Sequence, residues 1–254
     1  MTELNPAPAP ENGSDNSEIA LEVRNLYVGY YEDLHILQGV SLKAQRAKIT
    51  TILGANGVGK STLLKAIYGF LKPSRGEVIL NGRNVVGTPT YKLIDLGLAY
   101  IPQQPGIFRW MTIEENLELG AYTFRRDKAR IKRKLEEVYA RFPVLKERRK
   151  SLAGKLSGGQ QRMVEVGRTL MTDPTVMLVD EPTAGLAKLL SEEVYQMLVN
   201  LKESGITIIL VDQEIRHALK IADYVYVLEL GRNKYEGPVE QFTSPADIKK
   251  AFWA

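Results

Sequence analysis

A glycine-rich segment that ends in lysine and serine is the part of this chain best suited to chemistry. It fits the phosphate-loop pattern and consists of Gly54-Ala55-Asn56-Gly57-Val58-Gly59-Lys60-Ser61. Because glycine lacks a Cβ, successive backbone N–H groups can point inward at phosphate oxygens. Lys60 would reach the β and γ phosphates, and the Ser61 hydroxyl would ligate Mg²⁺. The loop, with Thr62 after it, predicts a site for a nucleoside triphosphate with Mg²⁺.

Two adjacent acids, Asp180 and Glu181, end an apolar run at 176–179 that fits a strand buried on both faces. Asp180 is placed to hold Mg²⁺ directly or through a water molecule. Glu181 is the best candidate to polarise an attacking water. The alternative is a pair of solvated acids at a strand end, and Pro182 suits either interpretation. Downstream of a phosphate loop, the acids indicate nucleotide hydrolysis.

A third motif, Leu156-Ser157-Gly158-Gly159-Gln160, lies just before the acid strand. Ser157 can cap the helix predicted through Met163, Val166 and Leu170. Gly158 and Gly159 leave the start of that helix bare, so that its N–H groups can face an anion. The alternative is an ordinary helix cap that follows a loop. In a chain with a phosphate loop, the motif predicts a second contact with nucleotide.

The elements that must position these residues alternate between strand and helix. A strand at 48–53 leads into the phosphate loop, and a helix with Leu63, Leu64 and Ile67 on one face follows. Alternation resumes after the acid strand, with a helix at about 190–203, a strand at 206–211, a helix at 214–222 and a strand at 224–229. This order predicts a parallel sheet with helices on both faces. Strands at 19–28 and 78–80 predict an antiparallel layer beside the nucleotide.

In chain order, the phosphate loop, the segment at 156–160 and the acid pair resemble the motifs of the ATP-binding cassette (ABC) ATPases, and the resemblance covers about residues 19 to 240. The segment at 156–160 is similar to the ABC signature motif, which other phosphate-loop ATPases lack. The resemblance implies the ABC fold, an α/β phosphate-loop NTPase with a mostly parallel sheet, a flanking antiparallel layer and an inserted helical subdomain. It also implies that the signature contacts the ATP of a partner subunit, so that two ATP molecules lie between the copies of a head-to-tail dimer.

The resemblance also assigns residues outside the three motifs. Tyr30 is similar to the aromatic residue that stacks on adenine, with Tyr31 as its rival. Gln103 matches the glutamine that links Mg²⁺ to the helical subdomain, with Gln104 as the alternative. Under this assignment ATP and Mg²⁺ are the cofactors, and Ser61, Gln103 and Asp180 hold the metal.

Two positions depart from the commonest ABC pattern. Ala187 stands where most members have a dimer-contact aspartate, and Gln213 stands where most have the switch histidine. Gln213 can hydrogen-bond a γ-phosphate or water but cannot become a cation, so Glu181 must act as base without histidine's help. Both departures resemble the ATPases of branched-chain amino acid importers. The alternative is a subunit that has lost catalysis.

Composition limits the compartment and the relation to the membrane. The 254 residues are 44% hydrophobic, yet no apolar run is long enough to span a bilayer, and there is no cysteine. We expect a disordered leader at 1–17, an ABC domain at 18–240 with its helical subdomain at about 104–165, and a C-terminal tail at 241–254. The first residues lack the layout of a secretory signal. Together these features favour a peripheral protein on the cytoplasmic face of the membrane.

Basic residues gather at 125–150, where 12 of 26 residues are Lys or Arg and four are acidic. The simplest interpretation is a solvated amphipathic helix with Ile131, Leu135 and Val138 facing inward. The alternatives are a basic face near anionic lipid or a membrane partner, and a nucleic-acid patch. We expect no nucleic-acid partner.

We therefore interpret the chain as the ATP-hydrolysing subunit of a membrane importer for branched-chain or other hydrophobic amino acids. It would form a homodimer, or a heterodimer with a sister ATPase, and drive transmembrane permease subunits that receive solute from a periplasmic or extracellular binding protein. A groove at about 103–120 would receive a helix of those subunits. Its apolar residues would either dock that helix or pack within the subdomain; they are Ile107, Phe108, Trp110 and Met111. The alternatives are urea or amide import, export of a lipid-like molecule, and a soluble regulatory ABC ATPase that acts on nucleic acid or protein.

Overall fold

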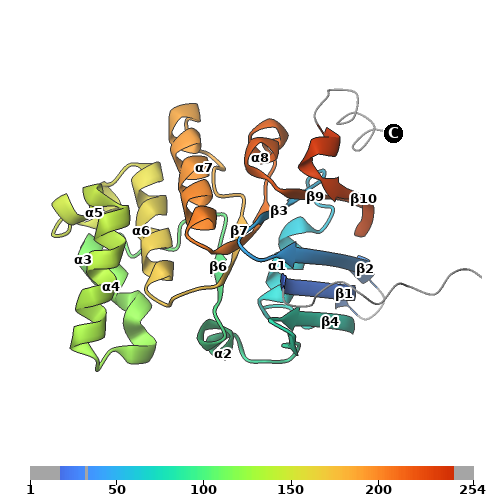
Figure 1. Ribbon diagram of the computed structural model, residues 1–254, viewed down its shortest axis with the longest axis horizontal. Helices are drawn as coiled ribbons and strands as arrows, with labels where there is room; N and C mark the ends of the chain where they lie inside the picture. The colour runs from blue at the N-terminus through green and yellow to red at the C-terminus, as the bar shows by residue number, and fades with distance from the viewer. Residues whose placement is uncertain (1–17, 32–33, 243–254) are drawn as a thin grey trace, which may run out of the picture.

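The computed structural model describes residues 18–31 and 34–242. The leader expected at 1–17 and residues 243–254 of the expected tail lie outside the described residues. In Figure 1 the helices α3 to α5 lie at one end of the molecule and an antiparallel sheet lies at the other, with a six-stranded sheet between them. Among the described helices, none is both long and apolar enough to cross a bilayer.

The six-stranded sheet has the order β10-β9-β3-β8-β7-β6, and all neighbours except β10 and β9 are parallel. Its strands are β3 (Ile49–Leu53), β6 (Leu98–Ile101), β7 (Val176–Asp180), β8 (Thr207–Val211), β9 (Tyr224–Glu229) and β10 (Arg232–Pro238). Every residue of β3, β7 and β8 is buried, as expected for strands covered on both faces. The prediction of a mostly parallel α/β sheet is confirmed.

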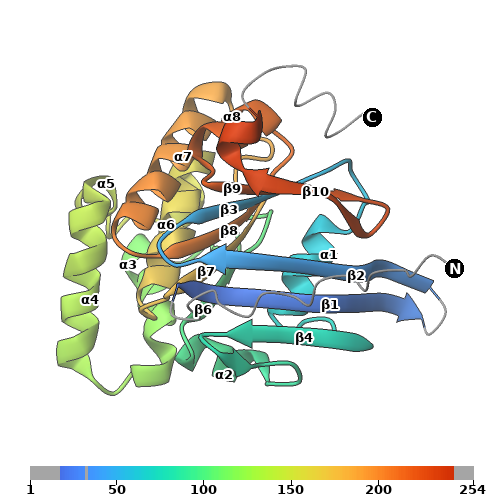
Figure 2. The same cartoon turned by 45° about the vertical axis from the view of Figure 1, so that its right-hand side comes forward.

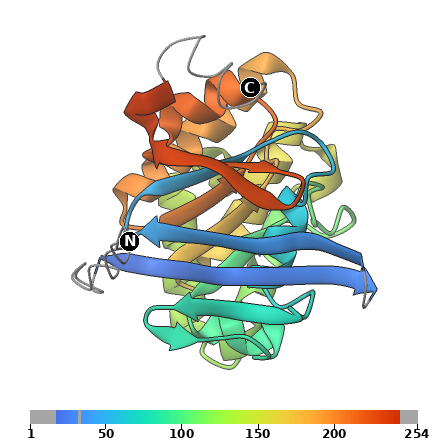
Figure 3. The same cartoon turned by 90° about the vertical axis from the view of Figure 1, so that its right-hand side faces the viewer.

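The antiparallel layer has the order β2-β1-β4-β5, and its long strands cross the front of the view in Figure 3. Its strands are β1 (Ile19–Tyr31), β2 (Leu34–Gln45), β4 (Arg75–Leu80) and β5 (Arg83–Asn84). This confirms the predicted flanking layer, although its strands are longer than the 19–28 and 78–80 segments from which it was inferred.

Two hydrophobic cores cover the two faces of the six-stranded sheet, because successive residues of a strand point to opposite sides. Val176 and Leu178 pack with α1 (Lys60–Ile67) and the antiparallel layer, near α2 (Thr90–Asp95). Met177 and Val179 pack with the helices on the other side of the sheet. Those helices are α6 (Gly158–Leu170), α7 (Lys188–Glu203) and α8 (Ile215–Ile221). Figure 2 shows α6 and α7 beside the sheet.

Between β6 and β7 the chain is mostly helical. The elements are α3 (Ile113–Glu118), η1 (Leu119–Phe124), α4 (Lys128–Arg141), α5 (Pro143–Glu147), η2 (Ala153–Lys155) and α6. Elsewhere, a short helical turn, η3 (Val239–Phe242), follows β10. On α4, Ile131 and Val138 are buried and Leu135 packs against the same core. The basic helix is therefore amphipathic in the way its spacing predicts.

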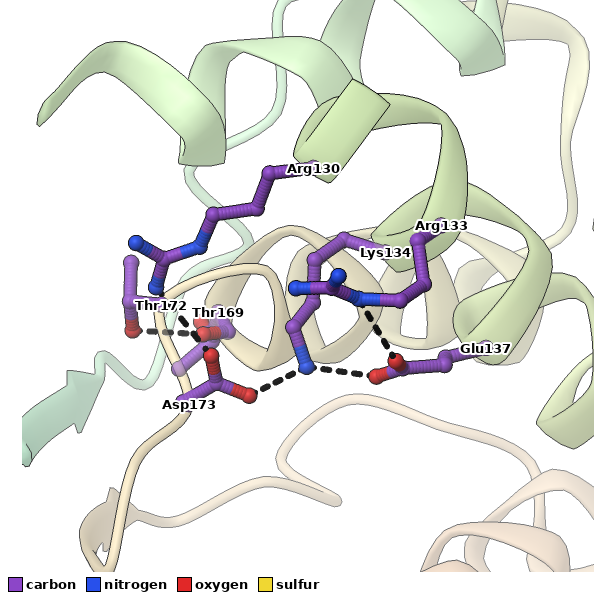
Figure 4. A network of polar contacts seen from close by, with 7 residues as sticks. All are labelled: Arg130, Arg133, Lys134, Glu137, Thr169, Thr172 and Asp173. Carbon is purple, nitrogen blue, oxygen red and sulfur yellow. Dashed lines mark hydrogen bonds and ion pairs between the residues drawn. The ribbon is translucent and has the colours of Figure 1, made fainter. Parts of the chain in front are cut away.

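An ion-pair cluster ties α4 to the turn after α6 (Figure 4). The Lys134 ammonium lies between the carboxylates of Asp173 and Glu137. Arg130 Nη2 lies 3.3 Å from Asp173 Oδ2, and Arg133 Nε lies 3.8 Å from Glu137 Oε1. Asp173 follows the C-terminal end of α6 and has a φ of 54°. The cluster therefore links the middle of α4 to the chain that connects α6 with the acid strand.

Candidate functional site

The site is built at the carboxyl ends of four neighbouring parallel strands. The phosphate loop follows β3, Pro102 and Gln103 follow β6, Asp180 ends β7 with Glu181 directly after it, and Asp212 follows β8. Parallel strands end at the same edge of a sheet, where α/β folds bind their ligands. Residues that are far apart in sequence therefore meet here.

At two positions of the phosphate loop, glycine is required because there is no room for a Cβ and because the backbone has a positive φ. Gly54 and Gly59 have φ values of 151° and 105°. A Cβ would lie 2.4 Å from the Leu228 carbonyl oxygen at Gly54 and 2.7 Å from Leu37 Cδ2 at Gly59. Gly57 has a φ of 82°, but a Cβ there would meet nothing within 4 Å. The loop thus holds a conformation that other residues would oppose.

Lys60, the first residue of α1, is only 4% exposed. Its ammonium donates hydrogen bonds to the carbonyl oxygens of Gly54 and Ala55, at 2.8 and 2.9 Å. Burial lowers the pKa of Lys60, and the nearby carboxylate of Glu181 partly offsets that effect. A buried cation that is held by the loop's own carbonyls fits a site for polyphosphate. Thr62 is also buried in the first turn of α1, whereas Asn56 is exposed and Val58 is half-buried.

A hydroxyl and a carboxylate that could ligate Mg²⁺ lie together. Ser61 Oγ donates to Asp180 Oδ1 at 2.8 Å, and the Tyr100 hydroxyl donates to Asp180 Oδ2 at 3.1 Å. Burial and the charge of Asp180 raise the pKa of Tyr100, so its hydroxyl stays a donor. No group of three or more His, Cys, Asp or Glu residues that could hold a metal occurs in the described part of the chain. One serine hydroxyl beside one carboxylate fits Mg²⁺ of the kind that is shared with substrate phosphates.

Glu181 is the point where three predicted residues meet. Its Oε2 accepts a hydrogen bond from Gln103 Nε2 at 2.6 Å and another from Gln213 Nε2. The residue is 7% exposed, and its φ of 43° places it in the left-handed region. Its N–H donates to the Val211 carbonyl at 2.8 Å. The strained backbone is bonded to β8, and the carboxylate is held by Gln103 and Gln213, so its position is fixed. Gln103, one of the two candidate glutamines, is the one that reaches it.

A buried ion pair that sequence reasoning missed holds the segment that contains Gln103. Arg162 of α6 is 1% exposed, and it donates to the carbonyls of Pro102 at 2.7 Å and Gln103 at 2.6 Å. It also pairs with Glu165 at 2.6 Å, and Glu165 Oε1 accepts the Gly106 N–H. Burial raises the pKa of Glu165 and lowers that of Arg162. The sequence did contain a signal for this pair, because Arg162 and Glu165 carry opposite charges and lie three residues apart on a predicted helix.

The signature segment begins α6 as expected. The Ser157 hydroxyl accepts the Gln160 N–H, and Gln160 Oε1 accepts the Ser157 N–H in return, which is a capping box. Arg148 Nη1 also donates to Gln160 Oε1, at 3.0 Å. The prediction that Ser157 caps this helix is confirmed.

The two signature glycines do more than leave the helix start bare. A Cβ on Gly158 would lie 2.7 Å from Leu186 Cδ2, and one on Gly159 would lie 3.3 Å from Leu190 Cδ2. The glycines therefore also let the 184–187 loop and the start of α7 approach α6 closely.

The motifs of one chain do not all lie together. The phosphate loop leads into α1 on one face of the six-stranded sheet, and the signature begins α6 on the other face. A cavity of about 510 Å³ opens beside the acids and is lined by residues that include Gln103, Glu181 and Gln213. Tyr30 lies in β1, but its side chain, like that of Tyr31, is outside the described residues.

A phosphate loop, a buried acid pair and a capped signature helix on a mostly parallel sheet define an ATP-hydrolysing cassette. The profile of the ABC transporter family matches residues 37–184, so the chain belongs to this family and is an ATPase. It is 37% identical to the high-affinity branched-chain amino acid transport ATP-binding protein BraG of Pseudomonas aeruginosa. That match covers 80% of this chain and 86% of BraG.

Two further similarities cover nearly the whole chain. The probable branched-chain amino acid transport ATP-binding protein LivF of Archaeoglobus fulgidus is 36% identical, over 87% of this chain and 93% of that protein. A crystal structure of an ATP-binding cassette of an ABC transporter in its ADP conformation superposes with a TM-score of 0.81 at 29% identity. That superposition covers 91% of this chain and 97% of the cassette.

Proposed function

We propose that this ABC ATPase powers a membrane importer of branched-chain or similar hydrophobic amino acids, acting from the cytoplasmic face. The hydrolytic part of the proposal rests on the amides of Gln103 and Gln213, which both reach the Glu181 carboxylate. The solute class rests on the relatives named for branched-chain amino acid transport.

Different residues of the site have different roles in hydrolysis. Mg²⁺, when bound through Ser61, Asp180 and Gln103, would neutralise charge on the phosphates. The loop N–H groups and Lys60 hold the phosphates in place. Glu181 accepts the proton of the attacking water, and the amides of Gln103 and Gln213 orient that water and the carboxylate. Glutamine at 213 can donate and accept hydrogen bonds without changing charge, so Glu181 is the only base in this arrangement.

A second copy of the chain, or a sister ATPase, completes each site. The capped start of α6 at Ser157 presents N–H groups suited to phosphate. It begins a helix on the opposite sheet face from α1, which favours contact with the nucleotide of a partner rather than its own. Ala187 lies in the loop that packs beside these glycines, where it would face that partner.

The permease subunits would dock on aromatic side chains beside the helical segment. Phe108 is 54% exposed and Trp110 is 89% exposed, whereas Ile107 packs against the core and Met111 is half-buried. We assign the two exposed aromatic residues to docking, and Ile107 and Met111 to packing within the subdomain. Large exposed aromatic residues of this kind are typical of protein interfaces.

Uptake of labelled leucine by cells tests this function. Disruption of the chain should abolish uptake, the wild-type chain should restore it, and Glu181→Gln should not. If leucine uptake persists while uptake of another solute fails, the solute class is wrong.

Capture of the tagged chain from detergent-solubilised membranes should recover polytopic membrane proteins. Recovery of nucleic acid in their place would favour the soluble regulatory alternative.

A further inference from the structure

A buried tyrosine, Tyr195, connects two segments of the site through hydrogen bonds to Asp212 and Thr183. It lies on α7 and is 5% exposed. Its hydroxyl donates its one proton to Asp212 Oδ2 at 2.9 Å and accepts the hydroxyl proton of Thr183 at 3.1 Å. Thr183 lies two residues after Glu181. One hydroxyl therefore joins the loop after the acid pair to the end of β8.

Asp212 connects Tyr195 to Gln213, because its two carboxylate oxygens bind different partners. Its other oxygen, Oδ1, accepts the backbone N–H groups of Gln213 at 2.7 Å and Glu214 at 2.9 Å. Asp212 is 2% exposed, and burial raises the pKa of its carboxyl group while the three hydrogen bonds act in the opposite direction. With Oδ2 held by Tyr195, the orientation of Oδ1 and thus the turn that begins at Gln213 are fixed.

We propose that Tyr195 is a positioning residue for ATP hydrolysis, whose hydroxyl holds Asp212 and Thr183 so that Gln213 stays against Glu181. The inference rests on the proposed roles of Glu181 and Gln213. A small displacement of a positioned group has a large effect on rate, because the amide must meet the carboxylate and the water in one geometry. The phosphate loop is not part of this connection, so ATP binding should not depend on it.

Tyr195→Phe removes the hydroxyl and keeps the ring, which stacks on His217 with ring centroids 5.5 Å apart. We expect kcat to fall about tenfold, the effect of about 1.4 kcal/mol in the barrier. KM for ATP and the equilibrium affinity for ATP should stay within about twofold, because the binding loop is untouched.

Tyr226→Phe is the matched control. Tyr226 lies on β9 and is also 5% exposed, and its hydroxyl accepts the N–H of Lys43, on β2, at 2.9 Å. Tyr195→Phe loses two buried hydrogen bonds and Tyr226→Phe loses one, so the midpoint of thermal unfolding should fall in both variants, while only Tyr195→Phe should lose kcat. Equal kcat in the two variants, or an equal loss of ATP affinity and kcat in Tyr195→Phe, would overturn the inference.

Comparison with Gln213→Ala distinguishes failure of this inference from failure of the proposed role of Gln213. If Gln213→Ala is slow and the double variant with Tyr195→Phe is no slower, the tyrosine acts through Gln213, as inferred. If the two losses multiply, the tyrosine acts by another route and the inference is wrong. If Gln213→Ala turns over at the wild-type rate, the proposed role of Gln213 fails, and the positioning role fails with it.

Discussion

At the scale of the residue, Glu181 is the side chain on which the hydrogen bonds of the site converge. Its carboxylate accepts hydrogen bonds from Gln103 and Gln213 while its backbone stays in the left-handed region. Both amides are neutral, so neither of them would share the proposed base role. The strain at Glu181 is tolerated because the N–H is bonded to Val211 and the side chain is held on two sides.

Glu181→Gln should lower the rate of ATP hydrolysis by about 10²- to 10⁴-fold, because the group that takes the proton of water is lost. ATP binding should persist, since Lys60 and the loop are unchanged. Steady-state hydrolysis and equilibrium ATP binding measure the two effects, and gel filtration with ATP should show a stable dimer. Turnover at the wild-type rate would remove Glu181 from the role of base.

Gly59→Ala and Gly57→Ala separate backbone strain from steric clash in the phosphate loop. Both positions have positive φ, which costs an alanine about 1–3 kcal/mol at most, but only Gly59 would place its Cβ against Leu37. We expect ATP affinity to fall further in Gly59→Ala than in Gly57→Ala, as measured by equilibrium binding. The same affinity in both variants would show that the close approach to Leu37 has no effect.

The site residues found from sequence were those that lie in continuous motifs. The loop from Gly54 to Ser61 and the acids after β7 are recognisable because their chemistry needs neighbours in the chain. Arg162 and Tyr195 were not found, because their partners lie 59 or 60 residues and 17 residues away. Their contacts exist only after α6 and α7 have packed on the sheet.

At the scale of the element, α6 is held at both ends. Near its start, Arg162 binds the segment after β6, and beyond its end, Asp173 is tied to α4. The orientation of the signature helix therefore depends on one buried ion pair and one partly exposed cluster. The two contacts differ in their expected contribution to stability because they differ in burial.

Arg162→Met should lower the free energy of unfolding by about 3–5 kcal/mol, because it leaves Glu165 as a buried charge without its partner. Adding Glu165→Leu should recover part of this loss, as urea denaturation can measure. Hydrolysis should stay low in the double variant, since the bonds to Pro102 and Gln103 remain absent. Full recovery of hydrolysis would show that Arg162 does not position Gln103.

Lys134→Met and Arg133→Met compare two cations of the α4 cluster. The Lys134 side chain is 10% exposed and meets two carboxylates, whereas that of Arg133 is 65% exposed and meets one. We expect Lys134→Met to cost about 1 kcal/mol of stability and Arg133→Met to stay within about 0.5 kcal/mol of wild type. Equal stability of the two variants in urea denaturation would contradict a structural role for the cluster.

Sequence predicted the elements that have a regular pattern. β3, β7 and β8 are continuous apolar runs, and α7 begins at Lys188, close to the expected start at about 190. No strand was expected at β2 or β10. In β2 the buried residues are Leu37, Val40, Leu42 and Ala44, and the first interval of three breaks the alternation of a strand. The pairing of β1 with β2 shifts register in the same region.

At the scale of the whole molecule, the phosphate loop and the signature are built on opposite faces of one sheet. The first leads into α1 and the second begins α6, with the buried strands between the two cores. The sequence could place each motif on its element, but only the folded sheet relates the two faces. This arrangement underlies the central claim that each hydrolytic site is shared between two copies of the cassette.

ATP-driven dimer formation in a background that cannot hydrolyse ATP tests this claim most directly. We would compare Glu181→Gln with the double variant Glu181→Gln/Ser157→Arg, measuring molecular mass by light scattering with ATP and ATP affinity by equilibrium binding. We expect a dimer for the first chain and a monomer for the second, because the arginine would block the helix start that faces the partner's nucleotide. The monomer should bind ATP with nearly unchanged affinity. A double variant that still dimerises with ATP, or one whose monomer has lost ATP affinity, would contradict a site shared between two copies.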